Sequence, residues 1–368
     1  MSEELKHVSP DAIIEFPTGT IKASTLELML NKLPFELGYC NEDNIFTWFS
    51  AKPDRLRPRR VKTLGEKVFD LHPHIAPKVR VLLDRFEKGE EQNWILHFPN
   101  KEGKAGRGYK KFIAVRDIET NEYLGSMDAT VDLAIFEDKA GKHTPETIKR
   151  YEKAEEVPEV EIRQTQVEGP AADYKSDEVI IDFETGKIKA STLDTIIRLC
   201  PFEMGFCDAE DNFRWYSNNP TRVHHRRTSA FGHSVLKLHP KVAHHVRVML
   251  DDFKSGTKDE WAFWFPKRSG EAGQMYQKFM AVRDPETNEY LGCMDITVNI
   301  DQFFDEEGME AMKEGAVPGG RPLDGSGAPY VAYPNGEKMP ARHSRRHGEA
   351  GHPGGHPGAD LHVEEMNP

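Results

Sequence analysis

The chain has 368 residues, a formal net charge of −12, and 38% hydrophobic and 30% charged residues. The negative charge argues against a large nucleic-acid-binding surface. No apolar run reaches the roughly 18 residues that a membrane span needs, and the first residues lack the apolar core of a secretory signal. The four cysteines do not form a disulfide framework, so we expect a cytoplasmic protein in a reducing compartment.

One sequence unit occurs twice, at an offset of 167 residues. Lys111–Val131 contains two apolar, β-branched runs around a turn-forming Asp-Ile-Glu-Thr-Asn-Glu, which is typical of a β-hairpin, and Lys278–Val298 repeats it. The ungapped match runs from Phe16–Phe136 onto Phe183–Phe303. Units of about 120 residues bury their own cores, so the repeat predicts two similar domains and not a solenoid.

The first half of each unit predicts strands around one helix. In the first copy, Ile13–Phe16 and Thr20–Lys22 flank a turn, and a helix follows that ends before Pro34. Phe35–Cys40 and Ile45–Ser50 are then predicted strands with a polar turn between them.

The second half of each unit predicts helices and then strands. A loop with short helical turns precedes a helix whose apolar positions Ile75, Val79, Leu82, Leu83 and Phe86 have helical spacing. A strand beginning at Trp94 and the hairpin complete the unit. This order predicts an α+β domain with a five-stranded antiparallel sheet and flanking helices.

The pattern divides the chain into four parts. We expect domains at residues 11–137 and 178–306. Residues 138–177 form a charged linker with a possible helix near 144–156, and residues 307–368 have the Gly, Pro and His content of a disordered tail.

Several short motifs of the repeat resemble those of PAS domains, and more specifically the PAS module that accompanies hemerythrin-like domains in some bacterial proteins. The motifs are Thr18-Gly19, Leu33-Pro34, Asn41-Glu42-Asp43-Asn44, Gly65, Leu71-His72-Pro73, Phe86, Gly89, Ala114-Val115-Arg116-Asp117 and Tyr123-Leu124-Gly125. The resemblance implies domains that bind a small molecule or cofactor between sheet and helices, or that only mediate dimerisation, and that signal through terminal helices.

The hairpin offers candidate ligand-binding residues. With a turn centred on Thr120-Asn121, one face of large apolar groups mixed with Gly and Ala would form either a pocket wall or ordinary core. A register shift of one residue would move the side chains of one strand to the other face of the sheet. The candidates are Phe112, Ala114, Arg116 and Met127, with Phe279, Ala281, Arg283 and Met294 in the second copy.

Other candidates have a structural alternative. Arg116 and Arg283 either bind an anionic group or form ion pairs. Trp48 and Trp215 either stack on a flat ligand or pack in the core. The basic residues Arg55, Arg59 and Arg60, matched by Arg222, Arg226 and Arg227, either bind phosphate or an acidic partner or belong to a solvated loop.

Histidines raise the possibility of haem. His72 and His239 each precede a helix, where they either bind iron or act in helix entry. His245 exists only in the second copy, on the helix where one type of haem-binding PAS domain places its ligand, and is otherwise a solvated histidine. The spacing of His224, His225 and His233 does not match a metal-binding motif. The tail contains further histidines that form either a weak metal-binding tract or part of a flexible end: His343, His347, His352, His356 and His362.

No nucleophile elbow, P-loop, dinucleotide fingerprint or paired-Cys zinc motif occurs. We therefore predict a non-enzymatic tandem-PAS sensor that binds a small ligand and signals through a protein partner or a homodimer, without nucleic acid or membrane. The alternatives are a ligand-free dimerisation or interaction scaffold, and a haem-based redox or gas sensor in the second domain.

Overall fold

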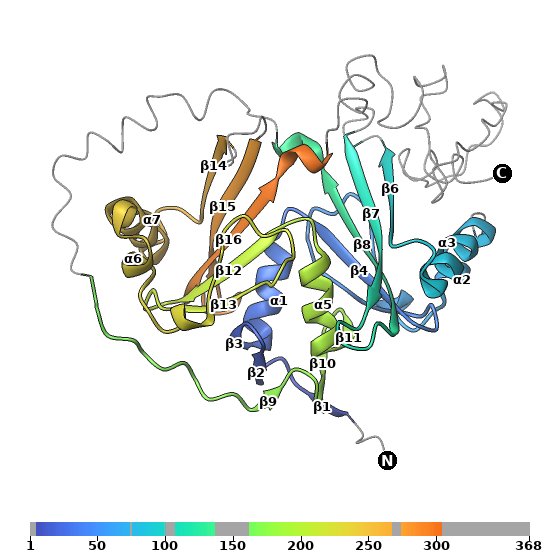
Figure 1. Cartoon of the computed structure of the whole chain (residues 1–368), viewed down its shortest axis with the longest axis horizontal. Helices are drawn as coiled ribbons and strands as arrows, with labels where there is room; N and C mark the ends of the chain where they lie inside the picture. The colour runs from blue at the N-terminus through green and yellow to red at the C-terminus, as the bar shows by residue number, and fades with distance from the viewer. Residues whose placement is uncertain are drawn as a thin grey trace. The chain divides into compact units, whose positions relative to one another are not determined.

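The computed structural model describes residues 5–73, 76–98, 100, 107–136, 162–266 and 274–303. The predicted linker helix near 144–156 and the His-containing tail lie outside these residues. The described chain forms two β-sheets with a few helices, which confirms the predicted α+β class (Figure 1).

The body of each repeat contains the five predicted strands in antiparallel order. The first repeat has the order β5-β4-β8-β7-β6 and the second β13-β12-β16-β15-β14. The strands of the first body are β4 (Glu36–Asn41), β5 (Phe46–Phe49), β6 (Asn93–Phe98), β7 (Gly108–Arg116) and β8 (Tyr123–Asp132). Those of the second are β12 (Glu203–Asp208), β13 (Phe213–Tyr216), β14 (Glu260–Pro266), β15 (Gln274–Arg283) and β16 (Tyr290–Asn299).

Helices follow the second strand of each body. The first repeat has α2 (Val68–Leu71) and α3 (Ala76–Lys88), and the second has α6 (Val235–Leu238) and α7 (Ala243–Ser255). Each long helix buries the C-terminal part of the predicted apolar stripe, with Leu82, Leu83 and Phe86 in α3 and Met249, Leu250 and Phe253 in α7. The predicted Ile75 lies outside the described residues, and Val242, which precedes α7, is exposed. In the second repeat, α7 packs against β15 and β16 (Figure 1).

Within the described residues each sheet contains eight strands, so the predicted count of five strands per sheet is too low. The extra strands come from the start of each repeat: β1 (Lys6–Val8), β2 (Ile13–Phe16), β3 (Gly19–Lys22), β9 (Tyr174–Lys175), β10 (Val179–Phe183) and β11 (Gly186–Lys189). Each start continues into a helix, α1 (Ala23–Lys32) or α5 (Ala190–Leu199).

The chain divides into two compact units, and neither of them is one repeat. The first unit joins the start of the first repeat, up to Lys32, to residues 187–300 of the second. In this unit β3 pairs with β13, so the strand order continues β13-β3-β2-β9. The second unit contains residues 33–135 and the turn Glu184–Gly186 of the second repeat, where Gly186 pairs with Trp48 of β5.

The ends of the repeats are exchanged in the same way. Phe303, at the end of the second repeat, packs edge-to-face on Tyr109 of the first, with ring centroids 4.8 Å apart. Phe136, at the end of the first repeat, packs on Tyr276 of the second at 5.3 Å. Each unit therefore combines the body of one repeat with segments of the other, and β10 and α5 of the second repeat belong to the first unit. The boundaries 11–137 and 178–306 stay a prediction of the repeating sequence.

The exchange depends on a glycine in each initial turn. Gly19 has a φ of +119°, and a Cβ there would overlap the carbonyl oxygen of Arg214 in β13. Gly186 has the same φ, and its Cβ would overlap the carbonyl oxygen of Thr47 in β5. Only glycine combines this conformation with so close a backbone approach.

We expect Gly19→Ala to destabilise the protein more than Gly65→Ala does. Gly65 also has a positive φ, of +87°, but nothing lies within 4 Å of a Cβ at that position. Both variants strain the backbone, but only Gly19→Ala also places a Cβ against a strand. This overlap should lower the free energy of unfolding by about a further 2 kcal/mol. Urea unfolding measures the difference, and equal losses would show that the contact of Gly19 with β13 is not formed.

Candidate ligand-binding site

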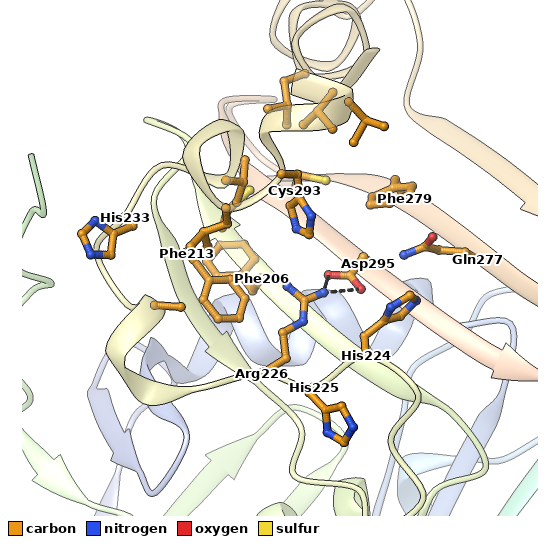
Figure 2. A pocket seen from close by; sticks show the side chains of 18 of the residues that line it. Phe206, Phe213, His224, His225, Arg226, His233, Gln277, Phe279, Cys293 and Asp295 are labelled. Atoms are coloured by element: carbon orange, nitrogen blue, oxygen red, sulfur yellow. Dashed lines mark hydrogen bonds and ion pairs between the residues drawn. The ribbon is translucent and has the colours of Figure 1, made fainter. Parts of the chain in front are cut away.

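A cavity of about 700 Å³ lies inside the second repeat (Figure 2). Its walls come from β12, β13, β15 and β16, from the loop 223–233, and from α6 and α7. One part of the lining is apolar and includes Phe206, Phe213, Phe279, Val246, Met249 and Leu250. The polar part includes His224, His225, Arg226, His239, Gln277 and Asp295.

An ion pair forms the polar centre of the cavity wall. Nη2 of Arg226 donates to both carboxylate oxygens of Asp295, at 3.2 and 3.1 Å (Figure 2). The guanidinium also lies 4.9 Å from the ring centroid of Phe213. A Cβ at Gly205 would overlap Oδ1 of Asp295. The sequence thus keeps a glycine in β12 where the pair needs room.

The loop that carries His224 and Arg226 is held by a second carboxylate. Glu203, at the start of β12, accepts hydrogen bonds from the backbone amides of Val223 and His224. Nε of Arg222 donates to the carbonyl of His224 at 2.8 Å, and its guanidinium lies 3.6 Å from Glu203. These hydrogen bonds therefore fix the polar wall to the sheet.

Helix α7, which supplies the apolar wall, is tied to the turn between β12 and β13. The carboxylate of Asp211 in that turn is buried and lies 3.1 Å from Arg247 and 2.7 Å from Lys254 of α7. The first repeat has Asn44 at the position of Asp211. Only the second repeat therefore has an acidic anchor for its long helix at this position.

The first repeat has more cations in the equivalent region. Asp128, the counterpart of Asp295, pairs with Arg59 and also with Lys110, at 3.4 Å. Lys110 lies 4.9 Å from the ring centroid of Phe112, and Arg57 lies 4.3 Å from that of Phe98. The second repeat has the shorter, neutral Gln277 in place of Lys110 and His224 in place of Arg57.

These charges change the acidity of their neighbours. Burial alone would raise the pKa of Asp128, but the charges of Arg59 and Lys110 outweigh burial and lower that pKa to about 2. Burial lowers the pKa of Lys110 to about 8, although Asp128 opposes the shift. Burial also lowers the pKa of Arg57 to about 10.

The predicted face of the hairpin is wrong by one residue. Phe112 lies opposite Asp128 and Ala114 opposite Ser126, whereas Met127 lies opposite Ile113. A register shift next to Arg116, a β-bulge, moves the second strand by one position. The same shift next to Arg283 places Phe279 opposite Asp295 and Met280 opposite Met294.

The predicted hairpin residues consequently separate. Phe279 lines the cavity, while Ala281 belongs to the adjoining core with Phe253. Phe112 and Ala114 pack with the core around Phe86. Met127 and Met294 are buried on the opposite face of their strands.

The two hairpin arginines fix the ends of helices. Arg116 donates to the carbonyls of Phe86 and Glu87 at the end of α3. Arg283 donates to the carbonyl of Phe253 in α7 and forms an ion pair with Asp259 at 3.0 Å. Cations near a helix C-terminus stabilise it, so both arginines have a structural role.

The other predicted aromatic and basic residues lie mainly inside the protein. Trp48 and Trp215 are fully buried in β5 and β13, outside the cavity lining. The solvated-loop alternative is wrong for Arg55, Arg59, Arg222 and Arg226, whose side chains are at most 17% exposed and take part in ion pairs.

Of the three histidines predicted as cofactor ligands, one reaches the cavity. His239 is an exposed residue on its lining. His72 is exposed at the end of α2 in the first repeat. His245 is not part of the lining, and burial, followed by the neighbouring His244, lowers its pKa. The cavity thus gives no support to haem ligation by His245, and haem stays a prediction.

Sequence reasoning did not single out Asp295, Gln277 or the cysteines of the cavity. The available signal was the difference between the copies, since Lys110 becomes Gln277 and Arg57 becomes His224 at the 167-residue offset. In the part of the chain that the structure describes, no three or more His, Cys, Asp or Glu side chains form a group suited to a metal ion. Nor does any described helix have the length and apolarity of a membrane span.

Comparison with known proteins gives a family match for both repeats. A family model described as PAS domain matches residues 26–134 and 193–301, more than half of the chain. A search of curated proteins gave no match.

Solved structures similar to the chain include a C-terminal domain from Streptococcus mutans, with 24% identity, 35% of this chain and 97% of that chain covered, and a TM-score of 0.32. A PAS domain from Colwellia psychrerythraea has 14% identity and a TM-score of 0.23, and the match covers 29% of this chain and 92% of that chain. A sensory box sensor histidine kinase from Vibrio cholerae has 14% identity and a TM-score of 0.22, and the match covers 29% of this chain and 87% of that chain.

We expect Asp128→Asn to destabilise the protein more than Asp295→Asn does. Removing one partner of a buried ion pair leaves an uncompensated charge, which lowers the free energy of unfolding by about 3 kcal/mol or more. Asp128→Asn leaves both Arg59 and Lys110 without their carboxylate, whereas Asp295→Asn affects Arg226 alone. Urea unfolding at neutral pH compares the two, and a larger loss for Asp295→Asn would contradict the described charge arrangement.

Lys110 gives the protein a pH dependence in the alkaline range. Its pKa falls from 10.5 in the unfolded chain to about 8 in the folded protein. Between these values the unfolded state binds more protons, so the free energy of unfolding should rise with pH. The rise should be absent from Lys110→Gln, which introduces the residue of the second repeat. Urea midpoints at several pH values test this, and identical slopes in the two proteins would contradict it.

Proposed function

Because the chain belongs to the PAS domain family, we propose that it is a sensor whose second repeat binds a small ligand and passes the signal to a protein partner. Tandem PAS domains support a sensory or signalling role at the level of the family. The observation that carries the ligand proposal is the cavity of about 700 Å³ between the sheet and α7. Small-molecule sites are concave, mostly apolar and equipped with a few polar groups, as this cavity is.

The lining favours a ligand with a flat apolar part and a polar edge. Phe279 and Phe206 provide aromatic surface for the apolar part. Gln277 supplies both a donor and an acceptor, and His224 supplies ring nitrogens. Because Arg226 is already paired with Asp295, a fully ionised ligand has less to gain here than a neutral one with several hydrogen-bonding groups.

Helix α7 is the element that would respond to ligand binding. Val246, Met249 and Leu250 of α7 line the cavity, and Arg247 and Lys254 of the same helix bind Asp211. A ligand that contacts α7 biases any two arrangements of this helix by the difference in its affinity for them. We propose that this bias is the signal read by a partner or by a second copy of the chain.

The first repeat favours a second role, that of a scaffold. Lys110, Arg57 and Arg59 bring three cations to the region that corresponds to the cavity. A wall with this many charges suits interaction with a partner more than binding of a largely apolar ligand. We therefore propose a division of labour, in which the second repeat senses, the first supports, and neither catalyses. The proposed location is the cytoplasm.

The proposal is tested by filling the cavity. Val246→Trp places a large ring in the apolar wall, whereas Val248→Trp, on the same helix, changes an exposed position. Full-length wild-type protein and both variants are purified, extracted with organic solvent and analysed for small molecules by mass spectrometry. We expect one compound in the wild type and in Val248→Trp, depleted at least tenfold in Val246→Trp.

Two outcomes would contradict ligand binding at this site. Retention of the compound by folded Val246→Trp would place it elsewhere. Absence of any compound from all three proteins, together with an unchanged melting temperature across a library of neutral heteroaromatic compounds, would favour the scaffold alternative. Circular dichroism confirms that each variant is folded before the comparison.

A further inference from the structure

Two cysteines face each other across neighbouring strands in the cavity wall. Cys207 of β12 and Cys293 of β16 are register partners, and each is 5% exposed. Both line the cavity. In the first repeat the equivalent partners are Cys40 and Ser126. The second repeat therefore has a thiol pair at a position where the first has a thiol and a hydroxyl.

We propose that Cys207 and Cys293 are a redox-modification site, which forms a reversible disulfide when hydrogen peroxide enters the cavity. This inference is independent of the identity of the ligand. It explains how two buried thiols are reached, since the cavity that they line admits molecules far larger than peroxide.

The reaction balances with peroxide as the only oxidant. One peroxide oxygen transfers to the sulfur of one cysteine, which becomes a sulfenic acid as one water leaves. The sulfur of the other cysteine then attacks the first sulfur and the S–O bond breaks, so that the hydroxyl leaves as a second water with the thiol proton. Two thiols are oxidised to one disulfide, and peroxide is reduced to two waters.

The two thiols share one environment. The hydrogen bond with Cys207, together with burial, raises the pKa of the Cys293 thiol well above its ordinary value. Because the sulfurs are register partners with equal exposure, either one can take the oxygen while the other resolves the sulfenic acid.

The backbone at this site can accommodate the bond. Opposite residues of antiparallel strands have Cβ atoms about 4.5–5.5 Å apart, and a disulfide prefers about 3.8 Å. Closure therefore draws β12 and β16 together by about 1 Å. A register shift between β12 and β13 lies next to Cys207, and Gly292, with a φ of +145°, precedes Cys293. A disulfide under such strain is readily reduced, as a reversible switch requires.

The test counts thiols in the full-length protein. Folded protein is treated with a small molar excess of hydrogen peroxide, quenched with catalase, denatured, alkylated with iodoacetamide and analysed by peptide mass spectrometry. All four cysteines are free before oxidation. We expect alkylated thiols to fall from four to two, with one crosslinked peptide joining Cys207 to Cys293, and to return to four with dithiothreitol.

Variants separate this site from the other cysteines. Cys293→Ser, which copies the first repeat, should give no crosslink and a Cys207 sulfenic acid that dimedone traps. Cys40→Ser/Cys200→Ser retains the pair and should crosslink as the wild type does, which keeps the test decisive even where Cys293→Ser folds poorly. Four alkylated thiols after oxidation, a crosslink between other cysteines, or sulfinic acid at Cys207 without a crosslink would overturn the proposal.

Discussion

The close approach of a turn glycine in each repeat to a strand of the other repeat is the constraint on which this structure depends. Gly19 lies against β13 and Gly186 against β5, both in a conformation that L-residues rarely adopt. Because these contacts hold, β2 and β3 extend the sheet of the second repeat and β10 and β11 extend that of the first, while Phe136 and Phe303 pack on aromatic rings of the opposite repeat. Duplication has thus produced two units that each require both halves of the chain.

Within this shared framework, a few substitutions separate the two repeats. Gly38 and Gly205 leave room for an arginine–aspartate pair in each sheet. Lys110 adds a second cation to the pair in the first repeat, while Gln277 leaves the second repeat with a neutral group beside its cavity. Asp211 then anchors α7, the helix that covers this cavity. The conserved geometry of the fold and the divergent chemistry of the wall together favour sensing by the second repeat.

The sequence predicted the strands of each body and the long helices, because their apolar periodicity is strong. It could not predict that the initial strands of one repeat pair with the body of the other. The initial turns carry the same glycine in both copies, so each turn is compatible with either body. The β-bulge at Arg116 escaped detection for a related reason: Tyr123-Leu124-Gly125 is compatible with both registers, and one residue reverses the faces. Phe279 and His239 were placed in the site, while Asp295 and Gln277 required the fold to bring distant strands together.

The most direct test of the account is whether the two halves of the chain stay together once the connection between them is cut. A protease site inserted within residues 138–161 allows cleavage of the folded protein, which is followed by size-exclusion chromatography at low concentration. The exchange of segments predicts one peak that contains both fragments in the wild type, and separation when Gly19 and Gly186 are both replaced by valine. Two separate peaks from the cleaved wild type, or co-elution unaffected by the glycine substitutions, would contradict it.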